Sequence, residues 1–187
     1  EAVGNDLLGK VAQGQESHGA PPGYYALIFP LFIWPLPVIA TQGMLAAISR
    51  FKADKRLRFL LAWYVPWWIL IELTPTKLPH YILPAYPALI LLSVWFLCTP
   101  HLENSAPSWH RWLINLARAG LAIASVAIAM LAIGLPVYGA GQISVLGILA
   151  ALVALATGFL GLNTNYHLAV KPVLFAGSLA LGSAMVW

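Results

Sequence analysis

One lysine stands out because of the residues around it: Lys77 lies in the string LTPTKLPHYILP, between two apolar stretches. Pro75 and Pro79 flank it, and a proline biases the residue before it away from helix. The sequence therefore predicts a stiff, non-helical turn that presents the ammonium at a membrane face, where a fixed cation could bind a phosphate. His80 and Tyr81 would add hydrogen-bond donors. An ordinary interfacial lysine that reaches toward lipid headgroups explains the same spacing equally well.

A second group of polar side chains comes just before the first apolar stretch, in ESHGAPPGYY. His18 could donate to a phosphate or carry a proton, since an unperturbed histidine has a pKa near ~6.5. Glu16 and the tyrosines Tyr24 and Tyr25 share this segment. Each of them alone fits a solvated loop or an interfacial anchor. Together with Lys77 they predict one polar site at a membrane face.

Glu72 is the acid that ends the apolar string WWILIEL. Acids within a membrane are costly and usually functional. Because Lys77 follows five residues later, we expect Glu72 to pair with that lysine or to be hydrated, rather than to relay protons. The sequence has no glycine-rich phosphate loop, no His-Glu-x-x-His and no Gly-x-Ser-x-Gly. Its one cysteine and its scattered histidines predict no metal site.

The elements that position these residues are predicted to be membrane-spanning helices. Of the 187 residues, 60% are hydrophobic and 9% are charged, whereas about a quarter of a soluble domain is charged. This composition excludes a water-soluble globule, and a net charge of +4 is too small to indicate nucleic-acid binding. Since about 20 apolar residues cross the hydrocarbon core, we expect an all-α, polytopic transmembrane helix bundle with about six spans. The apolar stretches are 24–48, 59–73, 81–98, 119–138, 143–162 and 172–187.

Basic residues predict which way the chain faces. The string SRFKADKRLRF, between the first two stretches, holds five bases and one acid. If this loop is cytoplasmic, eight of the ten Lys and Arg face the cytoplasm and only Lys10 and Lys77 lie outside. Such a bias is what the positive-inside rule describes. We therefore expect the polar site to face the periplasm or an equivalent lumen.

The pattern also predicts how the chain is organised. We expect a periplasmic juxtamembrane segment (1–23), three spans rich in Trp, Tyr and Pro (24–98), a cytoplasmic loop (99–118) and three packing spans (119–187). The small residues of these last spans, as in GLAIASVAIAMLAIG, predict close helix packing. Apolar residues at helical spacing between Glu1 and Gln15 predict a short helix along the bilayer surface, with a frayed loop as the alternative. The chain does not begin with Met and shows no leader pattern, so we expect it to be part of a longer protein.

Two strings in this chain resemble a known family. The string E…DLL.K…GQE.HG.PPGYY before the first span, and TPTKLPHYILPAYPAL after the basic loop, are similar to the bacterial membrane glycosyltransferases of the aminoarabinose transferase and protein O-mannosyltransferase superfamily, which have the GT-C fold. KLPHYILPAYPAL is the more specific string. The resemblance covers about the first ninety residues, and the last three spans match only as generic hydrophobic helices.

The resemblance implies transfer of a sugar, with inversion at the anomeric carbon, from a polyprenyl-phosphate carrier to a periplasmic acceptor (lipid A, protein or another glycan) at the bacterial inner membrane. The lipid-linked sugar is then the donor substrate, no cofactor is implied, and a divalent cation is left open. The residues implied to line the lipid-phosphate cavity are Lys77, His80 and Tyr81, and those at its juxtamembrane mouth are Glu16, His18, Tyr24 and Tyr25. The catalytic aspartate of such enzymes lies in their first periplasmic loop. No residue here matches it, so we expect this chain alone to be inactive.

Two readings from other classes stay open. Half of a lipid transporter or flippase would place charged or broken-helix sites at the membrane midplane, and these spans carry no ionisable group there. A structural membrane subunit would tolerate replacement of the whole Lys, His and Tyr cluster. Membrane lipids are partners in all three readings, and nucleic acid is a partner in none.

Overall fold

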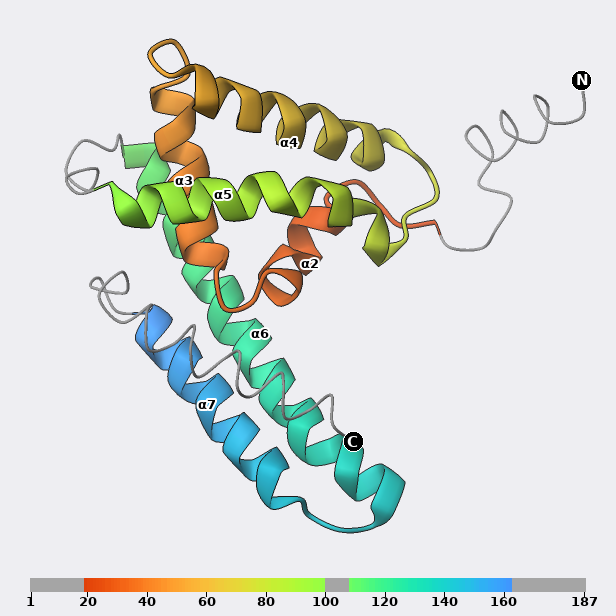
Figure 1. Cartoon of the computed structure of the whole chain (residues 1–187). Helices are drawn as coiled ribbons and strands as arrows, with labels where there is room; N and C mark the ends of the chain where they lie inside the picture. The colour runs from red at the N-terminus through yellow and green to blue at the C-terminus, as the bar shows by residue number, and fades with distance from the viewer. Residues whose placement is uncertain (1–18, 100–107, 163–187) are drawn as a thin grey trace, which may run out of the picture. The chain divides into compact units, whose positions relative to one another are not determined.

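The computed structural model describes residues 19–99 and 108–162, which fold into helices joined by short turns (Figure 1). The elements are α2 (Tyr24–Phe32), α3 (Pro37–Ser49), α4 (Lys55–Leu73), the 3-10 helix η1 (Pro79–Ala85), α5 (Tyr86–Cys98), α6 (Ser108–Ala140) and α7 (Val145–Gly161). The all-α prediction is confirmed for this part of the chain. The predicted surface helix at Glu1 to Gln15 and the predicted last span, 172–187, lie outside the described residues.

Two helical stretches of the described chain are long and apolar enough to cross a membrane. They are Pro79–Cys98, with 20 residues, and His110–Gly139, with 30 residues. A third candidate exists if α2 and α3 count as one broken span. α7 is apolar but has only 17 residues. These helices are consistent with the predicted membrane protein, with two to three candidate spans by length and composition.

The predicted first stretch, 24–48, is broken in the middle. α2 ends at Phe32, α3 begins at Pro37, and the two helices are bent by 120°. Pro35 and Pro37 explain the break, because each lacks an N–H for a helical hydrogen bond and biases the residue before it toward extended backbone. The predicted stretch therefore consists of two helices joined at a proline-rich bend, and it remains a candidate for one broken span.

Contacts divide the chain into two units, which we describe separately. The first unit is Glu1–Phe29 with Gly43–Cys98, and the second is Pro30–Gln42 with Thr99–Trp187. Within the first unit, α5 packs against α4 and η1 (Figure 1). Within the second, α6 and α7 pack side by side as a hairpin (Figure 1).

The core of the first unit is built where α3, α4 and α5 meet. Its fully buried members are Ala47, Leu57, Leu61 and Leu92. Gly43 lets α3 approach α5, because a Cβ at this position would lie 2.6 Å from the backbone oxygen of Leu92. The helices of this unit are therefore fixed by close backbone packing as well as by apolar burial.

The hairpin of the second unit packs through small residues, as the sequence predicts. Gly158 of α7 lies against Ser125 of α6, where an added Cβ would come within 2.8 Å of the serine Cβ. The Ser125 hydroxyl also accepts a hydrogen bond from the Trp34 indole at 3.0 Å. Small residues allow this approach and leave room for the buried polar pair.

Prolines in the string PHYILPAYP leave two backbone carbonyls without their usual partners. In a 3-10 helix the carbonyl of residue i accepts from the N–H of residue i+3, but Pro84 and Pro87 have none to give. Two tryptophans of α4, one turn apart, donate to these carbonyls in place of the missing N–H groups. The Trp67 indole donates to the Tyr81 oxygen at 2.8 Å, and the Trp63 indole donates to the Pro84 oxygen at 3.1 Å. These hydrogen bonds join α4 to η1, and the carbonyls are open to them because Pro84 and Pro87 lack an N–H.

We expect Trp67→Phe to lower the free energy of unfolding by about 0.5–1.5 kcal/mol, because the Tyr81 carbonyl then loses this donor. Thermal unfolding of the purified chain in an uncharged detergent measures this loss. Trp112→Phe is the matched control, since the Trp112 side chain is 65% exposed. Equal effects of the two substitutions would contradict a structural role for the Trp67 hydrogen bond.

Candidate functional site

The site begins at the carboxyl end of α4, where Pro75 cannot donate to the carbonyl of Ile71. Side chains supply the missing hydrogen-bond donors to the Ile71 carbonyl. The Thr74 hydroxyl donates to the Ile71 oxygen at 2.8 Å, and the Lys77 ammonium donates to the same oxygen at 3.3 Å. Lys77 also donates to the Glu72 backbone oxygen. The string TPTK thus caps a helix end with a hydroxyl and a cation, which suits the negative end of the helix dipole.

Glu72 connects this helix end to the beginning of α2. One carboxylate oxygen accepts from the Gly23 N–H at 3.0 Å, and the other accepts from the Tyr25 N–H at 3.1 Å. These are among the amide groups that a helix leaves without partners at its amino end. Gly23 has φ +91°, a conformation that residues with a Cβ rarely adopt. A carboxylate from α4 therefore caps α2, and a glycine makes the geometry possible.

Lys77 and Glu72 form an ion pair, with 3.3 Å between Nζ and Oε2. The lysine side chain is 2% exposed and the glutamate side chain is 17% exposed. The ammonium also lies 5.7 Å from the centre of the Tyr25 ring, within the range of a cation–π contact. The predicted pairing of Glu72 with Lys77 is confirmed, and the cation is enclosed by protein groups on several sides.

Two further contacts join the segment before α2 to the turn after α4. Gly19 and Thr76 form an isolated antiparallel bridge. The Tyr25 hydroxyl donates to the Leu78 oxygen at 3.1 Å. The strings PPGYY and TPTKLPHY, about fifty residues apart in the sequence, are therefore held against each other within the first unit. We call this cluster of Gly23, Tyr25, Glu72 and Lys77 the capping cluster.

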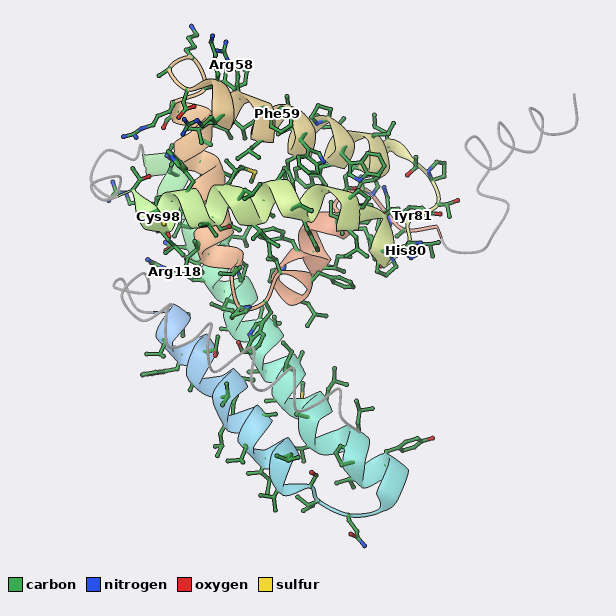
Figure 2. The ribbon with its side chains drawn as sticks, viewed as in Figure 1. Arg58, Phe59, His80, Tyr81, Cys98 and Arg118 are labelled. Atoms are coloured by element: carbon green, nitrogen blue, oxygen red, sulfur yellow. The ribbon has the colours of Figure 1, made fainter. Side chains whose placement is uncertain are left out.

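Two aromatic pairs lie on the elements next to the capping cluster. The rings of His80 and Tyr81 pack edge to face, with centres 4.9 Å apart. Tyr24 packs in the same way on Tyr25, at 5.2 Å. His80 is exposed and Tyr81 is half-buried, and Figure 2 shows both in the short helix that precedes α5. The exposed His80 ring and the half-buried Tyr81 ring therefore offer polar groups on η1.

Of the seven residues named from the sequence, Tyr24, Tyr25 and Lys77 are linked by contacts, and His80 and Tyr81 form a separate ring pair on η1. Glu16 and His18 lie outside the described residues. The predicted turn around Lys77 is non-helical, with Thr74 and Leu78 both extended. The expectation that this turn presents the ammonium at the surface is wrong, because Lys77 is 4% exposed. The Lys77 side chain turns inward because its ammonium donates to the Ile71 carbonyl, to which Pro75 cannot donate.

Sequence reasoning missed Gly23, Thr74 and the two tryptophans of α4. The signal for Thr74 and for Trp67 was present, since each proline implies a carbonyl that needs another donor. Which donor reaches it depends on how the helices pack, and spacing along the chain does not give that. Gly23 could have been noticed as the glycine just before a helix.

The capping cluster is closed on itself: the Lys77 ammonium donates to three oxygens of α4 and is buried, so it offers no free cation, and the cluster has no free acid for base catalysis. The Glu72 carboxylate is engaged by two amides and an ammonium. Among the described residues, no group of three or more His, Cys, Asp or Glu could hold a metal ion.

No protein-family model matches the chain, and no curated protein or solved structure matches it either. The resemblance to the GT-C glycosyltransferases therefore depends on the two strings quoted above.

Proposed function

We propose that this chain is part of a bacterial inner-membrane glycosyltransferase, which moves a sugar from a polyprenyl-phosphate carrier to a periplasmic acceptor. The observation that carries the proposal is the contact between PPGYY and TPTKLPHY through the capping cluster. These two segments belong to the strings that resemble such enzymes, and a shared site requires them to meet in space. The proposal includes about six spans and a site that faces the periplasm.

In this proposal the lipid phosphate approaches the exposed edge of η1. His80 and Tyr81 donate hydrogen bonds to it. Lys77, paired with Glu72, holds the turn that leads into η1. The phosphate is the leaving group, so the two donors offset the charge that it gains in the transition state. The acceptor hydroxyl needs a base from outside the capping cluster, because Glu72 is already held by three donors. The apolar surfaces of α4 and α5 suit a prenyl tail.

We expect His80→Ala to lower sugar transfer by about tenfold or more, because one hydrogen bond to a charged group is worth ~1.5–3 kcal/mol. The complete protein, expressed from its own reading frame and reconstituted in vesicles, is assayed with undecaprenyl-phosphate-linked sugar. Binding of undecaprenyl phosphate is measured on the same samples, and Tyr81→Phe is tested beside His80→Ala.

Tyr138→Phe is the matched control for Tyr81→Phe, since the Tyr138 side chain is 94% exposed and lies in α6. Both tyrosine variants keep the ring and lose only the hydroxyl. If His80→Ala and Tyr81→Phe bind the lipid phosphate as tightly as Tyr138→Phe does, the assigned phosphate site is wrong. Unchanged binding and transfer in all three would favour a structural membrane subunit.

A further inference from the structure

The turn between α3 and α4 concentrates positive charge at the protein surface. We call residues 48–59 the basic turn. Its five bases all have exposed side chains: Arg50, Lys52, Lys55, Arg56 and Arg58. With Asp54 as its one acid, the turn has an excess of four positive charges.

The basic turn is folded tightly by its own backbone. The N–H groups of Ala53 and Asp54 both donate to the Arg50 oxygen, at 2.9 and 3.2 Å, and Phe51 donates to the Ile48 oxygen at 3.2 Å. α4 then begins at Lys55. A closed turn of this kind keeps the chain from Arg50 to the beginning of α4 compact, so an anion at this turn meets several bases.

The charges of the basic turn are not balanced inside the described chain. Asp54 accepts from the Arg56 N–H at 2.8 Å and so serves as the amino cap of α4. The other described acid, Glu72, pairs with Lys77. The first turn of α4 contains bases and no acid, although the amino end of a helix favours negative charge. A negative group from outside the chain would relieve this repulsion.

Large apolar side chains border the same turn. Ile48 is 48% exposed, Phe51 is 44% exposed and Phe59 is 64% exposed. Figure 2 shows Arg58 and Phe59 as neighbours at the beginning of α4. After Phe59 the chain carries no charge until Glu72. The basic turn therefore lies where the sequence passes from charged to apolar, which is the composition of a headgroup region next to hydrocarbon.

We propose that the basic turn binds the headgroups of anionic phospholipids, with Phe51 and Phe59 placed among the upper parts of the acyl chains. The bases supply attraction to the phosphates, and each base near a charged membrane adds about fivefold in affinity. The exposed aromatic rings favour a phospholipid over other anions. A nucleic acid or free phosphate would leave Phe59 in water, whereas a phospholipid covers it.

Native mass spectrometry of the purified full chain, in an uncharged detergent, tests this assignment. The chain is titrated with phosphatidylglycerol and with phosphatidylcholine of the same acyl chains. We expect phosphatidylglycerol to bind in preference, and Lys52→Gln to weaken it about fivefold. Lys52→Arg retains the affinity, and Arg111→Gln, which removes an exposed base from α6, leaves it unchanged. Phe59→Ser weakens phosphatidylglycerol binding without a loss of charge.

Several results would overturn the assignment. Equal binding of the two phospholipids would mean that the bases do not select an anionic headgroup. Full competition by inorganic phosphate, together with no effect of Phe59→Ser, would indicate a site for free anions. Binding of a short RNA as tight as that of phosphatidylglycerol, lost in Lys52→Gln, would make the surface a nucleic-acid site. Equal losses of phosphatidylglycerol binding in Lys52→Gln and Arg111→Gln would mean that binding depends on the net charge of the chain and not on the basic turn.

Discussion

Glu72→Gln is expected to lower the free energy of unfolding by about 3 kcal/mol, since it leaves the buried Lys77 ammonium without an anion. The neutral amide also accepts more weakly from the Gly23 and Tyr25 N–H groups. We therefore expect the beginning of α2 to separate from the carboxyl end of α4. Thermal unfolding measures the first effect. Hydrogen exchange at the Gly23 and Tyr25 amides measures the second, because both should exchange faster in the variant.

Two further variants separate the ion pair from simple loss of packing. Lys77→Met should cost less than Glu72→Gln, because the carboxylate keeps its two amide donors. The double variant Glu72→Gln/Lys77→Met should regain part of the loss, since no buried charge remains unpaired. Lys55→Met, at an exposed base, is the control for loss of one positive charge. If Glu72→Gln and Lys55→Met unfold alike, the capping cluster contributes nothing to stability.

The capping cluster shows what could be predicted from the sequence and what could not. The pairing of Glu72 with Lys77 followed from spacing, because five residues across a helix end bring two side chains near one another. The burial of Lys77 did not follow from spacing. It depends on the carbonyl that Pro75 leaves open and on the ring of Tyr25, which another segment brings to the site. Contacts between distant segments decide whether a cation faces water or protein.

The helices show the same limit. Hydropathy predicted an all-α chain, and the described residues agree. It located the stretch 81–98 well, because α5 occupies this stretch from Tyr86 to its end at Cys98. It could not show that LFIWPLP bends the chain by 120°, since a hydropathy average treats proline as one more uncharged residue. Small residues in the later spans did predict close packing, because only glycine, alanine and serine let two backbones approach.

Gly147→Ala is expected to disrupt the α6–α7 hairpin, and it is the second large effect that we predict. Pro136 lies inside α6 and has no N–H to give to the carbonyl of Ala132, four residues earlier. Gly147 of α7 packs onto that carbonyl oxygen so closely that a Cβ would collide with it. The obstacle is backbone and cannot rotate away, so we expect a loss of about 1–3 kcal/mol. A weak Cα–H···O contact to the open carbonyl would be lost as well.

Gly134→Ala is the matched control for this substitution. Gly134 also lies within a helix of the second unit, but nothing within 4 Å would meet its Cβ. Alanine should therefore stabilise α6 there by up to about 1 kcal/mol, through helix propensity alone. Unfolding in detergent, together with cross-linking between cysteines placed at Ile133 and Leu146, follows stability and helix contact in both variants. Opposite signs for the two glycines are the expected result. A similar gain in both would mean that α7 does not depend on the carbonyl that Pro136 leaves open.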